Sequence, residues 1–278
     1  MAYRAIIILH IYYERMWTQV AKCVDCILHE CRCDIIVTIP DKIEGDATLV
    51  RRSILNRFPA AKIIHVENRG FDVGPFFEVV NGINLDDYDF LIKLHTKRDI
   101  HGIANGWVNG FHLSGTKWRD MLLGFCSSRQ AVHASVMRLT SDEKVGLVSC
   151  SEVIVPSCDY YERLYPEATS RALSIAKVGN GSFVAGTMFM IRANLLKPLQ
   201  KIWSINDFSM SSHGDNRNED KKDLLPYVLE RLIGYTVCSQ GFRLVDFRGY
   251  RPFFKWISFS ARMIAQLLRL MRRIGTLQ

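Results

Sequence analysis

Cationic side chains follow one another closely in the stretch KLHTKR, which covers residues 93–98. The stretch overlaps the end of an apolar run over residues 88–94, whose composition predicts a buried parallel strand. Because side chains alternate along a strand, those at positions 93, 95 and 97 are expected on one face. Cations gathered there favour a phosphorylated ligand, so we predict a phosphate-binding cluster of Lys93, His95, Lys97 and Arg98. The alternative is a solvated strand end with surface lysines.

A glycine-rich turn, NRGFDVGP at residues 68–75, follows a second apolar run at 61–66 that is also expected to be a buried strand. Its glycines permit unusual backbone angles, and its proline suits the first turn of a helix. Ligands of open α/β sheets bind beyond the carboxyl ends of the strands, so both loops should face one crevice. Arg69 is expected to contact phosphate or sugar there. Asp72 has two compatible roles, as a helix N-cap or as a contact of the sugar or of Arg69.

Two carboxylates lie on a predicted helix over residues 223–233. Asp223, Tyr227 and Glu230 stand at i, i+4 and i+7 and therefore share a face, while leucines and a valine occupy the opposite side. This polar face fits acceptor binding by Tyr227 and general-base catalysis by Glu230 or Asp223, with Glu230 preferred. The alternative is a solvated helix face on which Glu230 pairs with a neighbouring arginine.

The elements that must position these groups alternate between strand and helix. Strands are predicted at residues 5–11, 34–39, 61–66 and 88–94, and helices at 15–31, 48–58 and 75–81. This alternation predicts an α/β, Rossmann-type fold with a mostly parallel sheet flanked by helices.

The second half of the chain is less regular. A polar loop at 101–117 and a tyrosine-rich segment at 159–177 are expected beside a cleft, with helices at 118–126 and 129–139. Gly186 interrupts an apolar strand predicted at 182–192, either to let a substrate approach the backbone or to bend a buried sheet. Further strands are predicted at 145–149, 235–239 and 242–247.

The C-terminal residues 251–278 differ in composition from the rest of the chain. Residues 253–274 are rich in aromatic and aliphatic side chains, with a basic stripe at near-heptad spacing made by Lys255, Arg262, Arg269 and Arg273. Such a helix suits a membrane surface, and the charges make it a poor membrane span. Packing on the domain or against a second copy is the alternative.

Composition narrows the functional classes. The chain has 278 residues and 48% apolar content, enough for a large core, and its net charge of +8 favours anionic partners. Its eight cysteines suit reduced thiols in a cytosol, and those at 23, 26, 31 and 33 are placed on a helix and its following turn rather than around zinc. The N-terminal apolar run is predicted to be a core strand, not a signal peptide. No zinc-finger, RRM or helix-turn-helix signature supports nucleic-acid binding.

The order of elements resembles the nucleotide-sugar-binding half of inverting GT-A glycosyltransferases. In that fold the first strand ends near a tyrosine, the second near an acidic residue that contacts the nucleobase, and an Asn-x-Gly turn follows the third. The resemblance assigns these places to Tyr12, Asp41 and Asn68-Arg69-Gly70. The fourth strand of the fold normally ends in an Asp-x-Asp that holds a divalent metal, whereas this chain has His95-Thr96-Lys97.

Several motifs in order resemble the rhamnan synthesis protein F family of bacterial polysaccharide enzymes. They are NRGFDVGPF, KLHTKR, a Trp-Arg helix, AGTMFMIR and LERL, within residues 5–250. The Glu-Arg pair of the last motif falls on Glu230 and Arg231, which the resemblance places at the acceptor. Members often carry histidine three residues before the glutamate, where this chain has Tyr227.

The resemblance implies a GT-A-like glycosyltransferase domain over residues 1–250, with a donor half at 1–98 and an acceptor half at 99–250. The expected donor is dTDP-rhamnose, and the expected acceptor is a lipid-linked glycan at the inner face of the bacterial cell membrane. Lys97 and His95 would stabilise the leaving diphosphate in place of a divalent metal, and a carboxylate would deprotonate the acceptor in one inverting displacement. The alternatives are another donor such as a UDP-hexose, a scaffold of a polysaccharide assembly complex, or a basic nucleic-acid-binding module.

Overall fold

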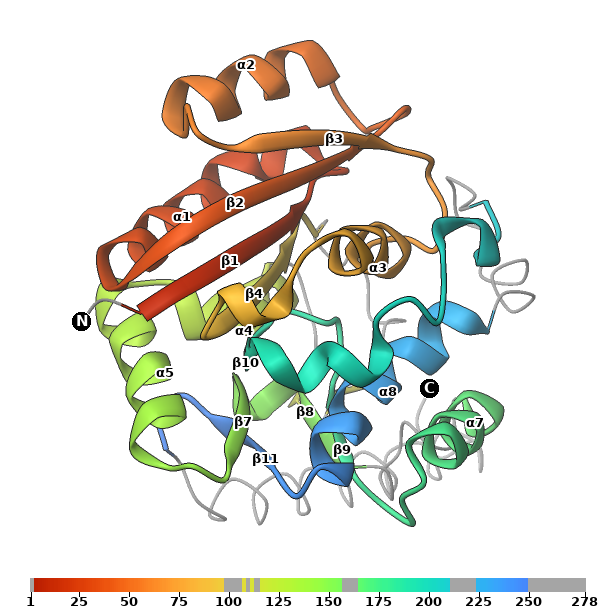
Figure 1. Ribbon diagram of the computed structural model, residues 1–278. Helices are drawn as coiled ribbons and strands as arrows, with labels where there is room; N and C mark the ends of the chain where they lie inside the picture. Colours follow the sequence, from red (N-terminus) through yellow and green to blue (C-terminus); the bar gives the residue numbers. More distant parts are fainter. Residues whose placement is uncertain are drawn as a thin grey trace, which may run out of the picture.

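A seven-stranded sheet forms the centre of the computed structural model, which describes residues 3–97, 107–108, 111–112, 116–156, 165–210 and 224–249 (Figure 1). The strand order is β11-β7-β10-β4-β1-β2-β3. Their bounds are Tyr3–His10 (β1), Cys31–Pro40 (β2), Lys62–Val66 (β3), Phe90–His95 (β4), Val145–Ser149 (β7), Phe189–Arg192 (β10) and Arg243–Asp246 (β11). β10 runs antiparallel to both of its neighbours, and the other pairings are parallel. The mostly parallel α/β sheet is therefore confirmed.

Two short pairs of strands lie outside the main sheet. Trp107–Val108 (β5) pairs with Phe111–His112 (β6), and Ile154–Pro156 (β8) pairs with Ser182–Val184 (β9). The α-helices described are Trp17–Glu30 (α1), Ala47–Arg57 (α2), Val73–Gly82 (α3), Lys117–Leu123 (α4), Arg129–Ser141 (α5), Pro166–Ala176 (α7) and Leu225–Ser239 (α8). Short 3-10 helices occupy Glu14–Met16, Leu85–Asp87, Gly124–Cys126, Ser151–Val153, Ala193–Leu199 and Ile205–Asp207.

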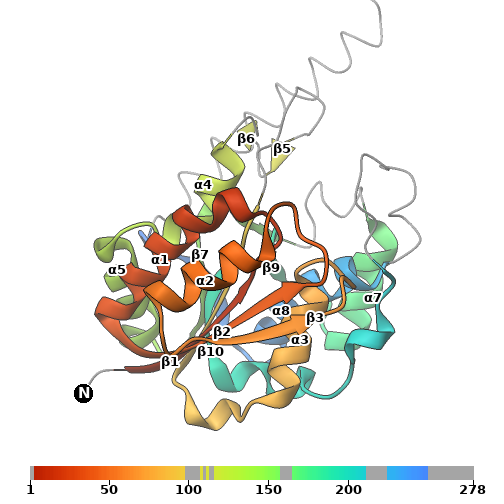
Figure 2. The ribbon, with the colours of Figure 1, turned by 90° about the horizontal axis from the view of Figure 1, so that it is seen from above.

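The helices cover both faces of the sheet. Seen from above, α1 and α2 lie over one face of β1 to β3, and α3 lies under the other (Figure 2). α1 packs beside α5, whereas α3 and α7 both contact α8. This two-sided cover explains why β1 and β4 are buried along almost their whole length.

All of the parallel strands end at one edge of the sheet. In the register, His10 at the end of β1 stands between His95 at the end of β4 and Thr38 of β2. The loops that follow β1, β2, β3 and β4 therefore meet beyond this edge, as the α/β rule requires. Strands from both halves of the chain share the sheet, because β10 pairs with β4.

Several local predictions from the sequence are wrong. Residues 235–239, predicted as a strand, continue helix α8, because Tyr235 and Val237 are buried there and tertiary packing outweighs their β-propensity. Residues 182–192 form β9 and β10 in two different sheets, not one interrupted strand. β3 is a partly exposed edge strand rather than a buried one. Cys31 and Cys33 lie in β2 and not in a turn after α1.

The predicted membrane contact falls on residues that the structure does not describe. Among the helices that it does describe, none is long and apolar enough to cross a membrane. The basic tail at 253–274 lies outside the described residues, so its predicted surface association stays a prediction.

Candidate active site

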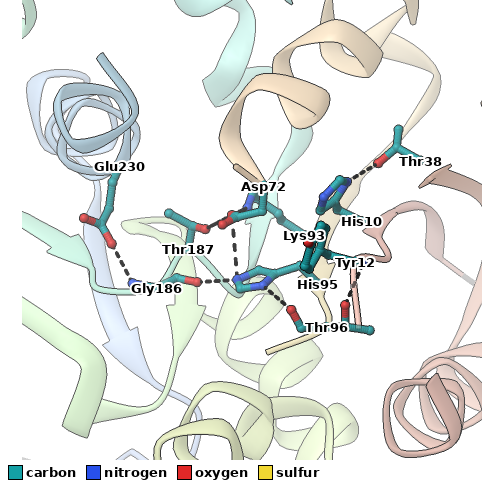
Figure 3. Close-up of polar contacts among 10 residues, drawn as sticks. All are labelled: His10, Tyr12, Thr38, Asp72, Lys93, His95, Thr96, Gly186, Thr187 and Glu230. Atoms are coloured by element: carbon teal, nitrogen blue, oxygen red, sulfur yellow. Dashed lines mark hydrogen bonds and ion pairs between the residues drawn. The ribbon is translucent and has the colours of Figure 1, made fainter. Parts of the chain in front are cut away.

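A buried polar network occupies the edge of the sheet where β1 and β4 end (Figure 3). It joins side chains from β4, the start of α3 and helix α8 through the turn between β9 and β10. The glycine-rich turn before α3 and the end of β4 are thus brought together, as the sequence predicts. The side chains at the centre of this network are buried, whereas a solvated strand end would expose them to water.

Lys93 and Asp72 form an ion pair at the centre of the network. The Lys93 side chain is 1% exposed, its ammonium also donates to Thr187 Oγ1 at 2.7 Å, and it lies 5.3 Å from the centre of the Phe76 ring. Burial lowers the pKa of Lys93, and the attraction of Asp72 opposes this effect. Lys93 therefore serves as the counter-ion of Asp72, whereas the sequence predicts a direct contact with phosphate.

Asp72 directs its carboxylate into the network instead of capping its helix. It stands at the N-cap position of α3, but its side chain accepts no capping hydrogen bond. Oδ2 accepts from Lys93 and, at 2.6 Å, from the hydroxyl of Thr187. Burial alone would raise the pKa of Asp72, but electrostatic interactions with His95, which is protonated only in acid, and with Lys93 and Lys97 lower it well below its usual value. Asp72 is consequently an ionised carboxylate, and it pairs with Lys93 rather than with Arg69.

His95 contributes a neutral imidazole. Its Nε2 lies 2.8 Å from the carbonyl oxygen of Gly186, so this nitrogen carries the proton and donates it. The same nitrogen is 3.7 Å from Asp72 Oδ2. Burial lowers the pKa of His95 to about 4, and that of His10, which bonds Thr38, to about 3. Near neutral pH His95 thus supplies a hydrogen bond, not the positive charge that the sequence predicts for a diphosphate.

Glu230 reaches the network from α8. Its Oε1 accepts a hydrogen bond of 2.7 Å from the Gly186 N–H, and its Oε2 lies 3.3 Å from Nη1 of Arg231. The Glu230 side chain is 16% exposed. Burial raises its pKa, while Arg231 and the Gly186 N–H oppose that rise. A carboxylate with a raised pKa is a stronger base than an ordinary glutamate, so the geometry and the electrostatics both suit a proton acceptor.

Arg231 lies inside the protein rather than at a surface that a ligand could touch. The residue is fully buried, and its guanidinium contacts Thr169 and the carbonyl oxygen of Tyr227. It also lies 4.8 Å from the ring centre of Phe183. Arg231 therefore acts on the site through Glu230, whereas the sequence predicts a direct acceptor contact.

Among the cations at this edge that the structure describes, Lys97 remains available for a ligand. It is half-buried, and among the described residues no hydrogen-bond or ion-pair partner of its ammonium is found. Its charge nevertheless influences the pKa of Asp72, His95 and Glu230, which places it close to all three. Arg98, the next predicted cation, lies outside the described residues.

The predicted nucleobase contacts line the loops beyond β1 and β2. The backbone N–H groups of Tyr12 and Tyr13 both donate to Thr96 Oγ1, at 2.9 and 3.0 Å, which fixes the Tyr12 loop to the end of β4. Asp41 follows β2 and is exposed. Both residues thus lie just beyond the carboxyl ends of β1 and β2, and their contact with a nucleobase stays a prediction.

The Asn-x-Gly turn packs against a distant part of the chain. Gly70 has a positive φ of 64°, and a Cβ there would lie 2.4 Å from the Phe208 ring. Arg69 donates to the carbonyl oxygen of Phe208 at 2.9 Å and pairs with Glu67, while Asn68 is buried. Phe208 was not predicted from the sequence, because its position 139 residues later carries no local signal.

On the acceptor side, the face of α8 follows the predicted pattern in part. Tyr227 and Glu230 are half-buried, whereas Leu225, Val228 and Leu229 are buried in the core. The Tyr227 ring stacks on Tyr165 with 4.5 Å between the ring centres. Asp223, the second candidate base, lies outside the described residues.

Thr187 is the important residue that the sequence prediction missed. The motif Gly-Thr-Met-Phe singled out its neighbour Gly186, but nothing local shows that the hydroxyl would meet Asp72, 115 residues earlier. A Cβ on Gly186 would lie 2.7 Å from Leu122 and 2.9 Å from Trp118. Close packing on α4 thus explains the glycine, and this is neither of the two roles predicted for it.

Within the described part of the chain, no group of three or more His, Cys, Asp or Glu side chains is arranged so that it could hold a metal ion.

Two relatives of the chain come from strains of Xanthomonas campestris pv. campestris, and both bear the name Uncharacterized protein WxcX. They are 27% and 26% identical to this chain over 198 residues, which is 70% of this chain. The matched segment is 26% of each relative, so the chain corresponds to about a quarter of their length.

Solved glycosyltransferase structures show a distant likeness. The mannosyltransferase PcManGT from Pyrobaculum calidifontis, solved with GDP-Man and Mn²⁺, is 12% identical, with 100% of this chain and 81% of that chain covered and a TM-score of 0.40. Glucosyl-3-phosphoglycerate synthase from Mycobacterium tuberculosis, solved with UDP, is 12% identical, with coverage of 86% and 81% and a TM-score of 0.39. TarS of S. aureus is 9% identical, with coverage of 87% and 57% and a TM-score of 0.39.

The family comparison covers most of the chain. Residues 1–242 match the sequence model described as Rhamnan synthesis protein F, and this range includes every described member of the buried network. The chain belongs to the rhamnan synthesis protein F family.

Proposed function

We propose that this chain transfers a sugar from a nucleotide donor to a growing glycan by a single inverting displacement. The observation that carries the proposal is the pair of carboxylates at the carboxyl edge of the sheet. Asp72 is held ionised by Lys93, whereas burial makes Glu230 more basic. Two carboxyl groups with opposite pKa shifts beside one available cation suit binding of a charged donor and activation of a hydroxyl.

Each group has a defined task in this reaction. Lys97 contacts the diphosphate and neutralises the charge that develops as it leaves, since its ammonium is not engaged by the described residues. Glu230 removes the proton of the acceptor hydroxyl, and Arg231 holds the Glu230 side chain. Asp72 accepts a hydrogen bond from the donor sugar. Tyr12 and Asp41 lie at the nucleobase, with Asn68, Arg69 and Gly70 forming the wall of the crevice.

We assign dTDP-rhamnose as the donor and a lipid-linked glycan as the acceptor, in keeping with the family. A UDP-hexose donor is the alternative that retains the same site. The diphosphate charge would be met by Lys97, with Arg98 in support, so that catalysis needs no divalent metal. Insensitivity of the transfer rate to EDTA is the expected result, and a rate restored only by Mg²⁺ or Mn²⁺ would remove this part of the proposal.

The donor site can be tested with nucleotides and one matched pair of variants. dTDP and dTDP-rhamnose, compared with UDP and GDP, should raise the melting temperature without added metal. Lys97→Ala should weaken dTDP binding about tenfold or more, because a charged hydrogen bond contributes about 1.5–3 kcal/mol. Lys62→Ala, an exposed lysine at the far end of β3, is the control and should bind normally. Equal dTDP binding by Lys97→Ala and the wild type would exclude the diphosphate contact.

Lack of any nucleotide response by the folded wild-type protein would favour the scaffold alternative. A preference for UDP would keep the site and replace the donor.

The basic tail would place the enzyme at its acceptor, on the inner face of the cell membrane. Its sequence combines aromatic residues and arginines, which favour an anionic interface. The full chain should sediment with vesicles containing phosphatidylglycerol, and a chain ending at residue 250 should remain in solution. Equal sedimentation of the two chains would remove the anchoring role.

A further inference from the structure

The turn between β9 and β10 has two consecutive residues with left-handed backbone angles. Gly186 has a φ of 80° and Thr187 a φ of 56°. Glycine adopts this region freely, but a β-branched threonine there is a genuine outlier. Such strain persists only where the surroundings enforce it, and it concentrates at functional sites. The contacts of this turn are therefore expected to enforce its backbone conformation and to serve the site.

Three polar groups of these two residues make four hydrogen bonds that hold the network together. The Gly186 N–H donates to Glu230, and its carbonyl oxygen accepts from His95. The Thr187 hydroxyl donates to Asp72 Oδ2 at 2.6 Å and accepts from the Lys93 ammonium at 2.7 Å. Figure 3 shows the turn lying between Glu230 on one side and Asp72 and His95 on the other. One short turn thus fixes both carboxylates of the site.

The two oxygens of Asp72 have different environments. Oδ2 accepts from Lys93 and Thr187 and lies 3.7 Å from His95. For Oδ1 the described residues provide no hydrogen-bond partner, and this oxygen is not among their buried unsatisfied atoms. The Asp72 side chain is 17% exposed. The carboxylate is therefore pinned through one oxygen and presents the other outward.

Glu230 differs in this respect, because the Gly186 N–H and the Arg231 guanidinium contact its two oxygens separately. The threonine hydroxyl thus acts only on Asp72. The Thr187 hydroxyl donates its single proton to Asp72 and accepts a hydrogen bond from the Lys93 ammonium. The hydroxyl therefore fixes the rotation of the Asp72 carboxylate as well as its position.

We propose that Thr187 is a positioning residue, whose strained backbone directs its hydroxyl to Asp72 so that Asp72 Oδ1 faces a hydroxyl group of the donor sugar. This inference rests on the proposed function for its ligand. Thr187 itself contacts no substrate. Its loss would allow the carboxylate to rotate around the Lys93 contact, and a hydrogen bond to the sugar would weaken while the nucleotide remained bound.

The test compares Thr187→Val with Thr187→Ser. Valine keeps the branched shape and removes the hydroxyl, whereas serine keeps the hydroxyl. Ser135→Ala is a control for loss of a buried hydroxyl elsewhere, since Ser135 lies on α5 and bonds only backbone carbonyls. The probes are dTDP-rhamnose and dTDP, or UDP-glucose and UDP if the wild type selects uridine, with affinity measured by calorimetry.

Thr187→Val should bind the nucleotide sugar about tenfold more weakly and the bare nucleotide within about twofold of the wild type. Thr187→Ser and Ser135→Ala should match the wild type for both probes. An unchanged ratio of the two affinities in Thr187→Val would overturn the proposal, because a general structural clamp affects both ligands alike.

A second readout needs no ligand and separates this proposal from the proposed function. In Thr187→Val, the released Asp72 carboxylate can turn toward His95, which would raise the pKa of His95 above about 4 in a nitrogen-15 NMR titration. Thr187→Ser should leave that pKa unchanged. If the wild type binds no nucleotide sugar, the proposed function fails and the titration decides the positioning role. An unchanged His95 pKa in Thr187→Val would then refute it.

Discussion

Asp72 and Glu230 have opposite electrostatic environments although one turn holds both. Both are largely buried, with 17% and 16% of their side chains exposed. Asp72 has an ammonium as its partner, and its pKa falls well below the usual value. Glu230 meets a peptide N–H and a guanidinium at 3.3 Å, and burial raises its pKa.

A compensating charge, more than burial, separates the roles of Asp72 and Glu230. A close ammonium makes Asp72 a permanent anion suited to binding, while weaker compensation leaves Glu230 able to take up a proton.

Glu230→Gln should have the largest effect, because it removes the proposed base and keeps the shape. The turnover number should fall by about 10²–10⁴-fold, the usual contribution of a general base, with dTDP affinity unchanged. The measurement is the release of dTDP from dTDP-rhamnose in the presence of a lipid-linked acceptor. In the wild type, the turnover number should decline on acidification around a pKa above that of an ordinary glutamate.

The control for this variant is Glu78→Gln, an exposed glutamate on α3. It should retain the wild-type rate. A Glu230→Gln enzyme with normal turnover would show that the two carboxylates do not divide the work as proposed, and Asp72 would then be tested as the base.

Lys93→Met should chiefly affect stability. It leaves the Asp72 carboxylate without its ammonium in a nearly dry site, and breaking a buried ion pair costs about 3–5 kcal/mol. The free energy of unfolding from urea titration should fall by about 3 kcal/mol, the lower end of that range, because Asp72 retains some exposure.

The double variant Asp72→Asn with Lys93→Met removes both charges and should recover most of the lost stability. A Lys93→Met protein as stable as the wild type would mean that Lys93 does not compensate Asp72, and the basis of the comparison would be lost.

Acid should weaken the fold through the histidines beside Asp72. Unfolded imidazoles bind a proton near pH 6.5, whereas His95 and His10 do so only near pH 4 and 3 when folded. The unfolded state therefore binds more protons between these values, and stability falls as pH drops from 6.5 toward 4. Each histidine contributes a slope of about 1 kcal/mol per pH unit.

Urea titrations at several pH values measure this slope. His95→Gln should reduce it, and His133→Gln should not, because His133 is an exposed residue on α5. An unchanged slope in His95→Gln would show that the imidazole is not held neutral.

The first hundred residues were predictable because their signals are local. Apolar runs alternate with helical patterns, and short turns join them, so the strands β1 to β4 and the helices between them were located within a few residues. The second half depends on packing between distant segments. Residues 235–239 have a strand composition but continue α8, because Tyr235 and Val237 pack into the core there.

The candidate site was predictable in its membership more than in its chemistry. The sequence placed Asp72, Lys93 and His95 at one crevice, since strand ends specify that much, and it proposed Gly186 and Glu230 as substrate or catalytic residues without placing them at the same point. It could not show that Lys93 pairs with Asp72, that His95 is neutral, or that Arg231 is buried, because each depends on contacts between residues 21 to 115 positions apart.

The α/β alternation, the edge at which the polar loops meet, and the family could all be predicted from the residues. The antiparallel insertion of β10 beside β4, which places the Gly186–Thr187 turn, is visible only in the tertiary structure. The physical reason is that local periodicity reports which side of an element is buried. The charge state of a buried group depends instead on which partners the fold brings within a few ångströms of it.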